Sequence, residues 1–169
     1  MRIGILTISD RSSRGERPDR SGPALQELIE SQGWTVANVE VVPDEFQLIR
    51  ERLISWSDSD GLDLILTTGG TGFSPRDITP EATVEVIDRE APGLAEAMRA
   101  ESIKITPHAM MSRARAGIRR RTLIVNLPGS PRAAVENFNV ILPVIEHAVD
   151  LLSDDPGAEA GHRFVDQNP

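Results

Sequence analysis

Short apolar runs alternate with amphipathic segments along most of the chain, and this alternation constrains the fold more than any other feature. Four runs rich in branched aliphatic residues predict strands at residues 3–8, 34–42, 62–67 and 122–127. Between them, apolar residues recur at the spacing of a helix with one buried face. Repetition of strand and helix predicts an α/β fold, in which a single three-layer domain has a mostly parallel sheet with helices on both faces.

The predicted helices begin and end at residues with known terminal preferences. Ser21 is expected to cap a helix that has Pro23 in its first turn, and Gly33 to end it. Thr79 is expected to cap another helix. The expected helices cover residues 21–33, 45–56, 79–90, 91–103, 106–112 and 131–152, with Pro143 expected to kink or split the last. Residues 116–119 are a further strand candidate, at an edge of the sheet.

Length and composition define the domain organisation and exclude several classes of protein. The chain of 169 residues suits one domain, residues 1–152, followed by a polar tail, residues 153–169, that is expected to be flexible. Acidic residues outnumber basic ones by 26 to 18, so no nucleic-acid or membrane partner is expected. The absence of cysteine excludes a disulfide scaffold and a cysteine nucleophile. No apolar stretch approaches the ~18 residues that span a bilayer, and the first residues lack a signal-peptide pattern, so a cytoplasmic protein is expected.

Four polar loops follow the predicted strands, at residues 9–20, 43–45, 68–77 and 128–132. In parallel α/β sheets, ligands bind beyond the carboxyl ends of the strands. Any specific chemistry is therefore expected in these four loops.

The third of these loops is rich in glycine. It contains Gly69, Gly70, Thr71 and Gly72, with the hydroxyl of Ser74 close behind. Glycines let the backbone approach a ligand and turn several N–H groups toward an anion. The loop matches neither common phosphate motif, because Pro75 stands where a dinucleotide fingerprint needs its third glycine and no lysine follows Gly72. A glycine-rich turn without a ligand remains an alternative.

Two aspartates follow neighbouring predicted strands. Asp77 comes after the glycine-rich loop, next to Arg76, whose planar guanidinium suits phosphate, and Asp44 directly follows the second strand. A carboxylate beside a phosphate site is unfavourable unless a cation lies between them, and Mg²⁺ is the usual mediator. Both aspartates could instead cap the helices that follow, and for Asp44 the local sequence by itself favours capping.

Two segments are rich in arginine. The loop at residues 9–20 contains four arginines, which either gather around an anionic ligand or lie in a solvated loop. Residues 113–121 contain five arginines and no acid, and form a second anion contact, a subunit contact or a solvated face. The sequence alone leaves these alternatives open.

Four motifs, in order over residues 1–152, resemble those of a known family. They are LTISDR, VPDE, TTGGTGFSPRDITPEAT and NLPGSPRAA, each at the end of a predicted strand. Together they resemble the molybdopterin adenylyltransferase family of molybdenum-cofactor biosynthesis. The resemblance implies a homotrimeric enzyme that binds ATP, Mg²⁺ and molybdopterin, attaches AMP to the terminal phosphate of molybdopterin and releases pyrophosphate. It also implies delivery of the product to a molybdate-inserting protein.

The resemblance further implies roles for particular residues. Asp44 and Asp77 fall on the family's two essential aspartates, which are expected to be catalytic and to hold Mg²⁺. The other implied contacts are Ser9, Asp10, Asp19 and Ser21 for the pterin, and Gly69, Gly70, Thr71, Gly72, Pro128, Gly129 and Ser130 for the phosphates and nucleotide. Ser74 and Arg76 are expected to donate to the same substrates. Two alternatives are a non-catalytic pterin-binding or trimeric scaffold member of the superfamily, and an unrelated nucleotide-binding oxidoreductase.

Overall fold

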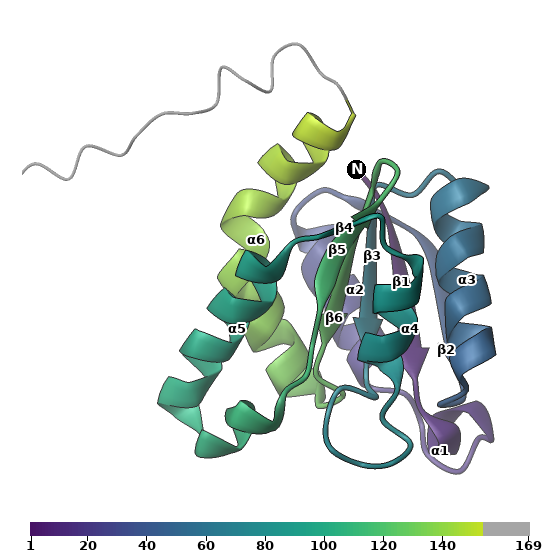
Figure 1. The fold of residues 1–169 in the computed structure, drawn as a ribbon, viewed down its shortest axis with the longest axis vertical. Coiled ribbons are helices and arrows are strands. Elements are labelled where there is room, and N and C mark those ends of the chain that lie inside the picture. Colours follow the sequence, from purple (N-terminus) through teal and green to yellow (C-terminus); the bar gives the residue numbers. More distant parts are fainter. Residues whose placement is uncertain (154–169) are drawn as a thin grey trace, which may run out of the picture.

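Six strands form one mixed sheet in the computed structural model, which describes residues 1–153 (Figure 1). The strands are β1 (Arg2–Ile8), β2 (Thr35–Val42), β3 (Leu64–Thr68), β4 (Arg89–Glu90), β5 (Ala116–Arg119) and β6 (Thr122–Leu127). Their order across the sheet is β2-β1-β3-β6-β5-β4. The first four in this order run parallel, whereas β5 is antiparallel to both of its neighbours. The carboxyl ends of β1, β2, β3 and β6 therefore share one edge of the sheet.

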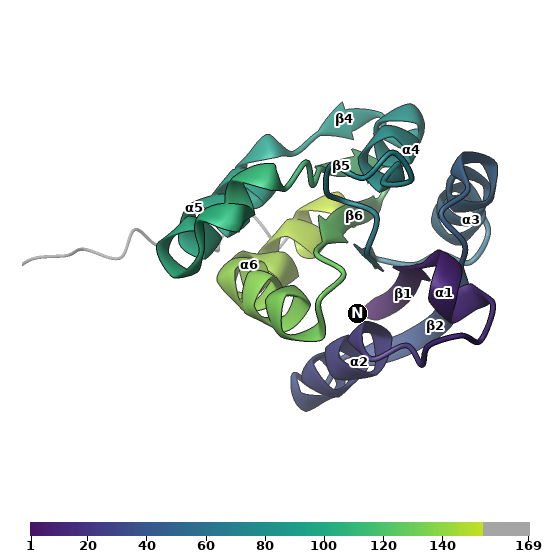
Figure 2. The ribbon, with the colours of Figure 1, turned by 90° about the horizontal axis from the view of Figure 1, so that it is seen from below.

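Helices cover both faces of this sheet (Figure 2). One face packs against α2 (Ser21–Ser31), α5 (Pro92–Ile105) and α6 (Pro131–Leu152), and the other against α3 (Phe46–Asp58) and α4 (Thr79–Val86). Successive strand residues divide between the two cores, so that Leu64 and Leu66 belong to one and Ile65 to the other. The three-layer α/β architecture predicted from the strand–helix pattern is confirmed.

Two short elements differ from the sequence predictions. The loop at residues 9–20 contains a one-turn helix, α1 (Asp10–Ser13), which Ser9 caps by accepting a hydrogen bond at its Oγ from the Ser12 N–H at 3.2 Å. The helix expected to reach residue 90 ends at Val86, because the chain becomes extended and pairs with β5 as strand β4. Strand β5 is therefore not an edge strand, since β4 covers its outer side.

Several helix boundaries also differ from expectation. Ser21 does not cap α2; Asp19 accepts hydrogen bonds from the Ser21 and Gly22 N–H groups at 3.0 and 3.2 Å instead. Thr79 lies inside the first turn of α4 rather than before it. Pro143 does not split α6, and residues 106–112 contain a 3₁₀ helix, η1 (Pro107–Met111). The predicted flexible tail, from residue 154 onward, lies outside the described residues.

The chain changes its direction of progress across the sheet between β1 and β3. From β1 it passes through α2 to β2 on one side, whereas β3 lies on the other side of β1 and pairs onward with β6. Such a switch point opens a crevice at the carboxyl ends of the two strands. Within the described residues, none of the helices is both long and apolar enough to cross a membrane.

Candidate active site

A cavity of about 1010 Å³ lies at this switch point, and residues from all four predicted loops line it. The predicted site residues that line it are Ser9, Asp10, Asp19, Ser21, Asp44, Gly69, Gly70, Ser74, Arg76, Asp77, Gly129 and Ser130. The other three, Thr71, Gly72 and Pro128, line a neighbouring cavity of about 290 Å³. The two glycine-containing loops therefore lie between the large crevice and a smaller cavity beside α5 and α6.

The arginines of the first loop belong to the large cavity. Arg11, Arg14, Arg17 and Arg20 all contribute to its lining, so this loop presents several cations to an anionic ligand. One of them, Arg14, is held by a two-point contact with Glu16 at 2.7 and 3.2 Å. The acidic net charge of the chain is thus locally offset at the crevice.

Asp19 holds the start of α2 in place, in the wall of the large cavity. Its carboxylate accepts hydrogen bonds from the Thr7 and Ser21 hydroxyls at 2.8 and 3.1 Å, in addition to the two N–H groups of the helix start. Gly22 is needed here, because a Cβ at this position would lie 2.4 Å from an Asp19 carboxylate oxygen. Asp19 and Ser21 therefore bond to each other at the cavity wall.

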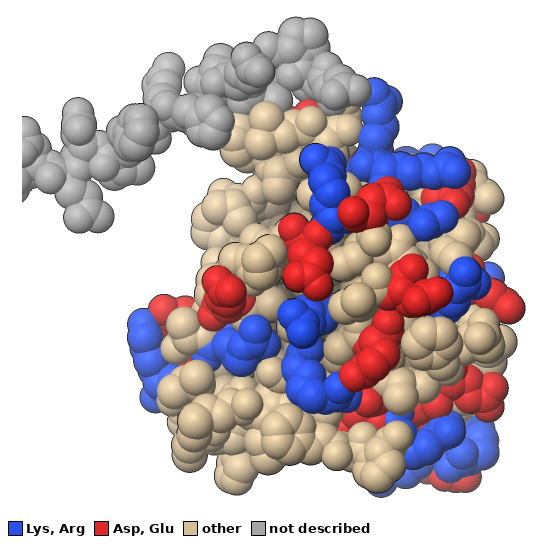
Figure 3. Space-filling view, in the orientation of Figure 1, with Lys and Arg blue, Asp and Glu red and all other residues tan. Residues whose placement is uncertain are grey.

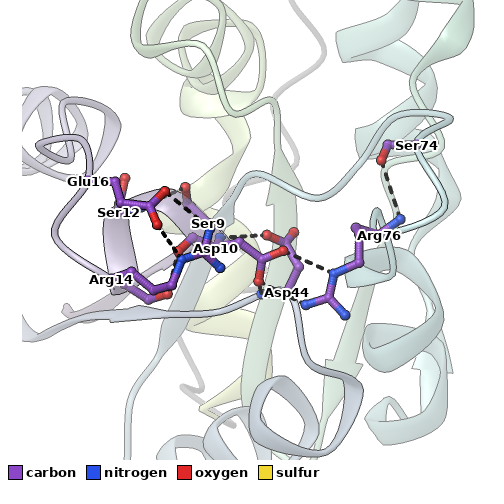
Figure 4. Close-up of polar contacts among 9 residues, drawn as sticks. Ser9, Asp10, Ser12, Arg14, Glu16, Asp44, Ser74 and Arg76 are labelled. Atoms are coloured by element: carbon purple, nitrogen blue, oxygen red, sulfur yellow. Dashed lines mark hydrogen bonds and ion pairs between the residues drawn. The ribbon is translucent and has the colours of Figure 1, made fainter.

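Asp10, Asp44 and Arg76 form a connected polar network across the crevice (Figure 4). Asp10 and Asp44 bond reciprocally, each carboxylate accepting the backbone N–H of the other, at 2.8 and 3.1 Å. Arg76 donates to both carboxylate oxygens of Asp10, at 2.8 and 3.0 Å. This contact joins the loop after β3 to the loop after β1 and neutralises Asp10.

The two carboxyl groups of this network have opposite pKa shifts. The hydrogen bond from Arg76 lowers the pKa of Asp10. Asp44 is only 8% exposed, and this burial raises its pKa, with the charges of Asp10 and Asp77 adding to the rise. Asp44 and Asp77 are thus close enough for their charges to repel.

The glycine-rich loop is tightly fitted between the two aspartates. Gly70 adopts φ +62°, and a Cβ there would lie 2.3 Å from Thr79 Oγ1 and 3.1 Å from Asp44 Oδ1. Asp77 accepts a hydrogen bond from the Ser74 N–H at 2.9 Å. Thr79, expected only as a helix cap, donates its hydroxyl to the Gly69 carbonyl at 2.9 Å and its N–H to the Gly70 carbonyl at 3.1 Å.

The second loop, residues 128–130, lies directly against the first. A Cβ on Gly129 would come within 3.2 Å of Gly69 Cα. Thr68 donates its hydroxyl to the Pro128 carbonyl at 2.7 Å, and Gly69 donates its N–H to Leu127 at 3.2 Å. These bonds bring together two backbone segments that the sequence separates by almost 60 residues.

The donor set at the crevice fits a magnesium ion shared with a ligand. Across the described residues, no group of three or more Asp, Glu, His or Cys side chains is arranged to hold a metal by itself. Asp10 is engaged by Arg76, and Asp19 by Thr7 and the start of α2, which leaves Asp44 and Asp77 as the lining carboxylates available to a cation. Mg²⁺ commonly binds through one or two carboxylates, substrate phosphates and water. A cation between Asp44 and Asp77 would also relieve their repulsion.

The arginine-rich stretch at residues 113–121 is mostly engaged in ion pairs with distant acids. Arg119 and Arg120 contact Asp58 at 2.6 and 3.2 Å, and Arg113 contacts Glu81. Figure 3 shows acidic and basic side chains interleaved over the face that carries α4 and β4. Arg113 also bonds to the glycine-rich loop, a role for which the sequence carries no local signal.

Comparison with known proteins agrees with this geometry. The family described as "Probable molybdopterin binding domain" matches residues 4–147. The chain is 45% identical to a molybdopterin adenylyltransferase of Helicobacter pylori, over 89% of this chain and 86% of that protein. The chain belongs to this molybdopterin-binding family.

Two further relatives differ in the share of their length that this chain covers. The crystal structure of the molybdopterin biosynthesis enzyme MoaB from Thermus thermophilus has 53% identity and a TM-score of 0.87, covering 92% of this chain and 98% of that one. The molybdenum cofactor synthesis protein cinnamon of Drosophila melanogaster is 48% identical over 90% of this chain. This chain spans only 26% of the length of cinnamon.

In this member of the molybdopterin-binding family, Asp44→Asn is expected to raise the melting temperature by a few degrees at neutral pH. The folded state raises the pKa of Asp44, so above that pKa the ionised carboxylate costs folding free energy, which asparagine removes. A change of about 1 kcal/mol shifts Tm by about 2–4 °C in a domain of this size. Calorimetry as a function of pH should show the gain shrinking as Asp44 of the parent becomes protonated in acid. A parent that is more stable than the variant at neutral pH would contradict this expectation.

Proposed function

We propose that this protein is a molybdopterin adenylyltransferase. An oxygen of the terminal phosphate of molybdopterin attacks the α-phosphorus of ATP, the bond from this phosphorus to the bridging oxygen breaks, and pyrophosphate leaves. The observation that carries the proposal is the position of Asp44 and Asp77 at one crevice with two glycine-containing loops. The family relatives named as adenylyltransferases support the same reaction.

The side chains and backbone groups of the crevice suit this transfer. Within residues 1–153, the N–H groups of Gly70, Thr71 and Gly72 donate to no protein acceptor. Gly70 lines the crevice and Thr71 and Gly72 line the neighbouring cavity, and we assign these N–H groups to phosphate oxygens. The arginines of the loop at residues 9–20 supply positive charge for the phosphate-bearing substrates. Asp44 and Asp77 would hold Mg²⁺, which when bound neutralises charge on the transferred phosphoryl group.

The roles of the remaining residues follow from their positions in the crevice. We assign Ser9, Asp10, Asp19 and Ser21 to the side that takes the pterin, because they line the wall formed by α1 and the start of α2. Arg76 is assigned to the phosphates, since it follows the glycine-rich loop and its exposed guanidinium lines the crevice beside Asp10. Gly129 and Ser130 complete the opposite wall.

The non-catalytic alternatives account less well for the two aspartates. A pure pterin-binding or scaffold protein gains nothing from a buried Asp44 whose charge is opposed by Asp10 and Asp77. A nucleotide-binding oxidoreductase would need a dinucleotide fingerprint, which Pro75 interrupts.

Formation of adenylylated molybdopterin from ATP tests the proposal directly. We expect product and pyrophosphate in equal amounts when molybdopterin, ATP and Mg²⁺ are all present, and no product when Mg²⁺ is chelated. NAD(P) binding should be absent. Pterin binding without ATP turnover under these conditions would favour the scaffold alternative.

We propose a homotrimer that works in the cytoplasm and delivers its product to a molybdate-inserting protein. Closed cyclic assembly covers surface that a single small domain leaves exposed, and side chains such as Ile105 and Met110 are 62% and 63% exposed in one copy. Light scattering at micromolar concentration and physiological salt is expected to give three times the mass of one chain. A monomer under these conditions would contradict the trimer.

A further inference from the structure

Arg113 connects the glycine-rich loop to the start of α4 from outside the crevice. It lies between η1 and β5 and does not line the large cavity. Its backbone N–H donates to the Thr71 carbonyl at 2.9 Å, and its Nε donates to the Gly72 carbonyl at 2.7 Å. One terminal nitrogen donates to the Asp77 carbonyl, and the other contacts the Glu81 carboxylate.

These contacts bind one side chain to both ends of a single loop. Gly72 and Asp77 are the two positions whose carbonyls the guanidinium reaches, and the loop between them contains Ser74 and Arg76. A planar guanidinium carries five donors in a fixed fork, so it can serve two carbonyls and a carboxylate at once. A lysine ammonium has no such fork.

The same contacts determine which backbone groups of the loop remain free. The carbonyls of Gly69 and Gly70 are bonded to Thr79, and those of Thr71 and Gly72 are bonded to Arg113. With these four carbonyls engaged, none of them is free to face a phosphate oxygen, whereas the N–H groups of Gly70, Thr71 and Gly72 stay unbonded within residues 1–153.

The contact at Asp77 has a second effect. A Cβ on Gly72 would lie 2.9 Å from an Asp77 carboxylate oxygen, so the Gly72 backbone and this carboxylate are already in close approach. Arg113 bonds to the carbonyls of both residues, and so adds to the bonds between Ser74 and Asp77 that close the loop.

We infer that Arg113 is a positioning residue, which acts from outside the crevice by holding the glycine-rich loop and Asp77 in the arrangement that receives metal-bound phosphates. The inference rests on the proposed function for its phosphate ligand. The ion pair with Glu81 is partly exposed, with side-chain exposures of 33% and 49%, so it contributes little by itself and serves to orient the guanidinium.

Three variants test this role. Arg113→Gln removes the fork and the charge, and Arg113→Lys keeps the charge but removes the fork. Arg115→Gln is the matched control, because Arg115 is an exposed residue of the same stretch whose backbone bonds to Asn126 do not depend on its side chain.

The first readout needs no ligand or activity. Hydrogen exchange of residues 69–78 in the ligand-free protein is expected to become at least tenfold faster in Arg113→Gln, less so in Arg113→Lys, and to stay unchanged in Arg115→Gln. Unchanged exchange in Arg113→Gln would overturn the inference and leave the proposed function untouched. If Arg113→Gln does not fold, Arg113→Lys decides by the same measurement.

The second readout uses Mn²⁺–ATP as the probe in the absence of molybdopterin. We expect its affinity to fall about tenfold in Arg113→Gln, and kcat for adenylylation to fall at least tenfold while KM for molybdopterin changes less than twofold. Faster loop exchange with parent-like Mn²⁺–ATP affinity and kcat would reduce Arg113 to a stabilising contact and overturn the inference. A parent protein that binds Mn²⁺–ATP but forms no adenylylated product would instead reject the proposed function.

Discussion

Replacing Asp44 or Asp77 with asparagine is expected to lower the rate of adenylylation by several orders of magnitude while the protein stays folded. Asparagine keeps the size of the side chain and an oxygen that accepts hydrogen bonds, so Asp44→Asn can still receive the Asp10 N–H. It removes the charge that binds a hard cation. The expected loss is on the scale of removing the metal from a phosphoryl-transfer site.

Binding of molybdopterin should respond differently from the rate. Each variant removes a negative charge from a crevice that receives an anionic substrate, so its affinity for molybdopterin is expected to stay the same or to increase. Formation of adenylylated molybdopterin measures the rate, and a thermal melt measures folding. Asp150→Asn, the same chemical change near the end of α6 and outside the cavity lining, is the matched control. Neither aspartate caps the helix that follows it, because Asp44 accepts the Asp10 N–H and Asp77 the Ser74 N–H. Near-normal turnover in either variant would restrict that aspartate to these structural bonds, and in both would reject the metal site.

Gly70→Val is expected to abolish substrate binding. At φ +62° a β-branched residue is strained by about 1–3 kcal/mol. Its Cβ would also need the space now taken by Thr79 Oγ1, 2.3 Å away, and would approach Asp44 Oδ1. Relief of these contacts must move either the glycine-rich loop or the side chain that anchors it.

Gly33→Val separates the strain from the contacts. Gly33 has φ +76° with nothing within 4 Å of an added Cβ, and it lies after α2, outside the cavity lining. It should therefore lose stability similarly while keeping activity. Binding of ATP and molybdopterin can be measured by titration calorimetry below both melting transitions. Normal binding of both substrates by folded Gly70→Val would show that the loop is only a turn.

Most of the fold was predictable because its signals are local. The four parallel strands carry apolar runs and the long α6 carries a periodic apolar pattern, and the glycine-rich loop stands at a strand end where ligand sites are expected. Strand β4 was not predictable, since two residues show no alternation and are extended only through pairing with β5. Asp19, and not Ser21, accepts the first N–H groups of α2, because both side chains can accept such bonds and only the three-dimensional path of the chain selects one.

The candidate site likewise contains residues that local sequence signals predict and contacts that they do not. Twelve of the fifteen predicted contacts line the crevice because they follow strands whose ends meet at one edge, which topology guarantees. The pairing of Asp10 with Arg76, and of Arg113 with Gly72, joins residues 66 and 41 positions apart with no periodic signal. Such contacts form only when the chain is packed. The residue patterns could therefore predict a phosphate and metal site, but not the Asp10–Arg76 and Arg113–Gly72 bonds that hold its loops in place.

The positions of Met1 and the end of α6 relative to the crevice decide where another domain can be attached without covering the site. Met1 and the end of α6 both lie at the edge of the sheet opposite α1 and the crevice loops (Figure 1). A polypeptide attached at either point leaves the mouth of the crevice open to diffusing molecules. The domain is therefore suited to modular fusion, in keeping with its match to about a quarter of the length of cinnamon. Tags or tethered enzymes added at these ends should leave substrate access unimpeded.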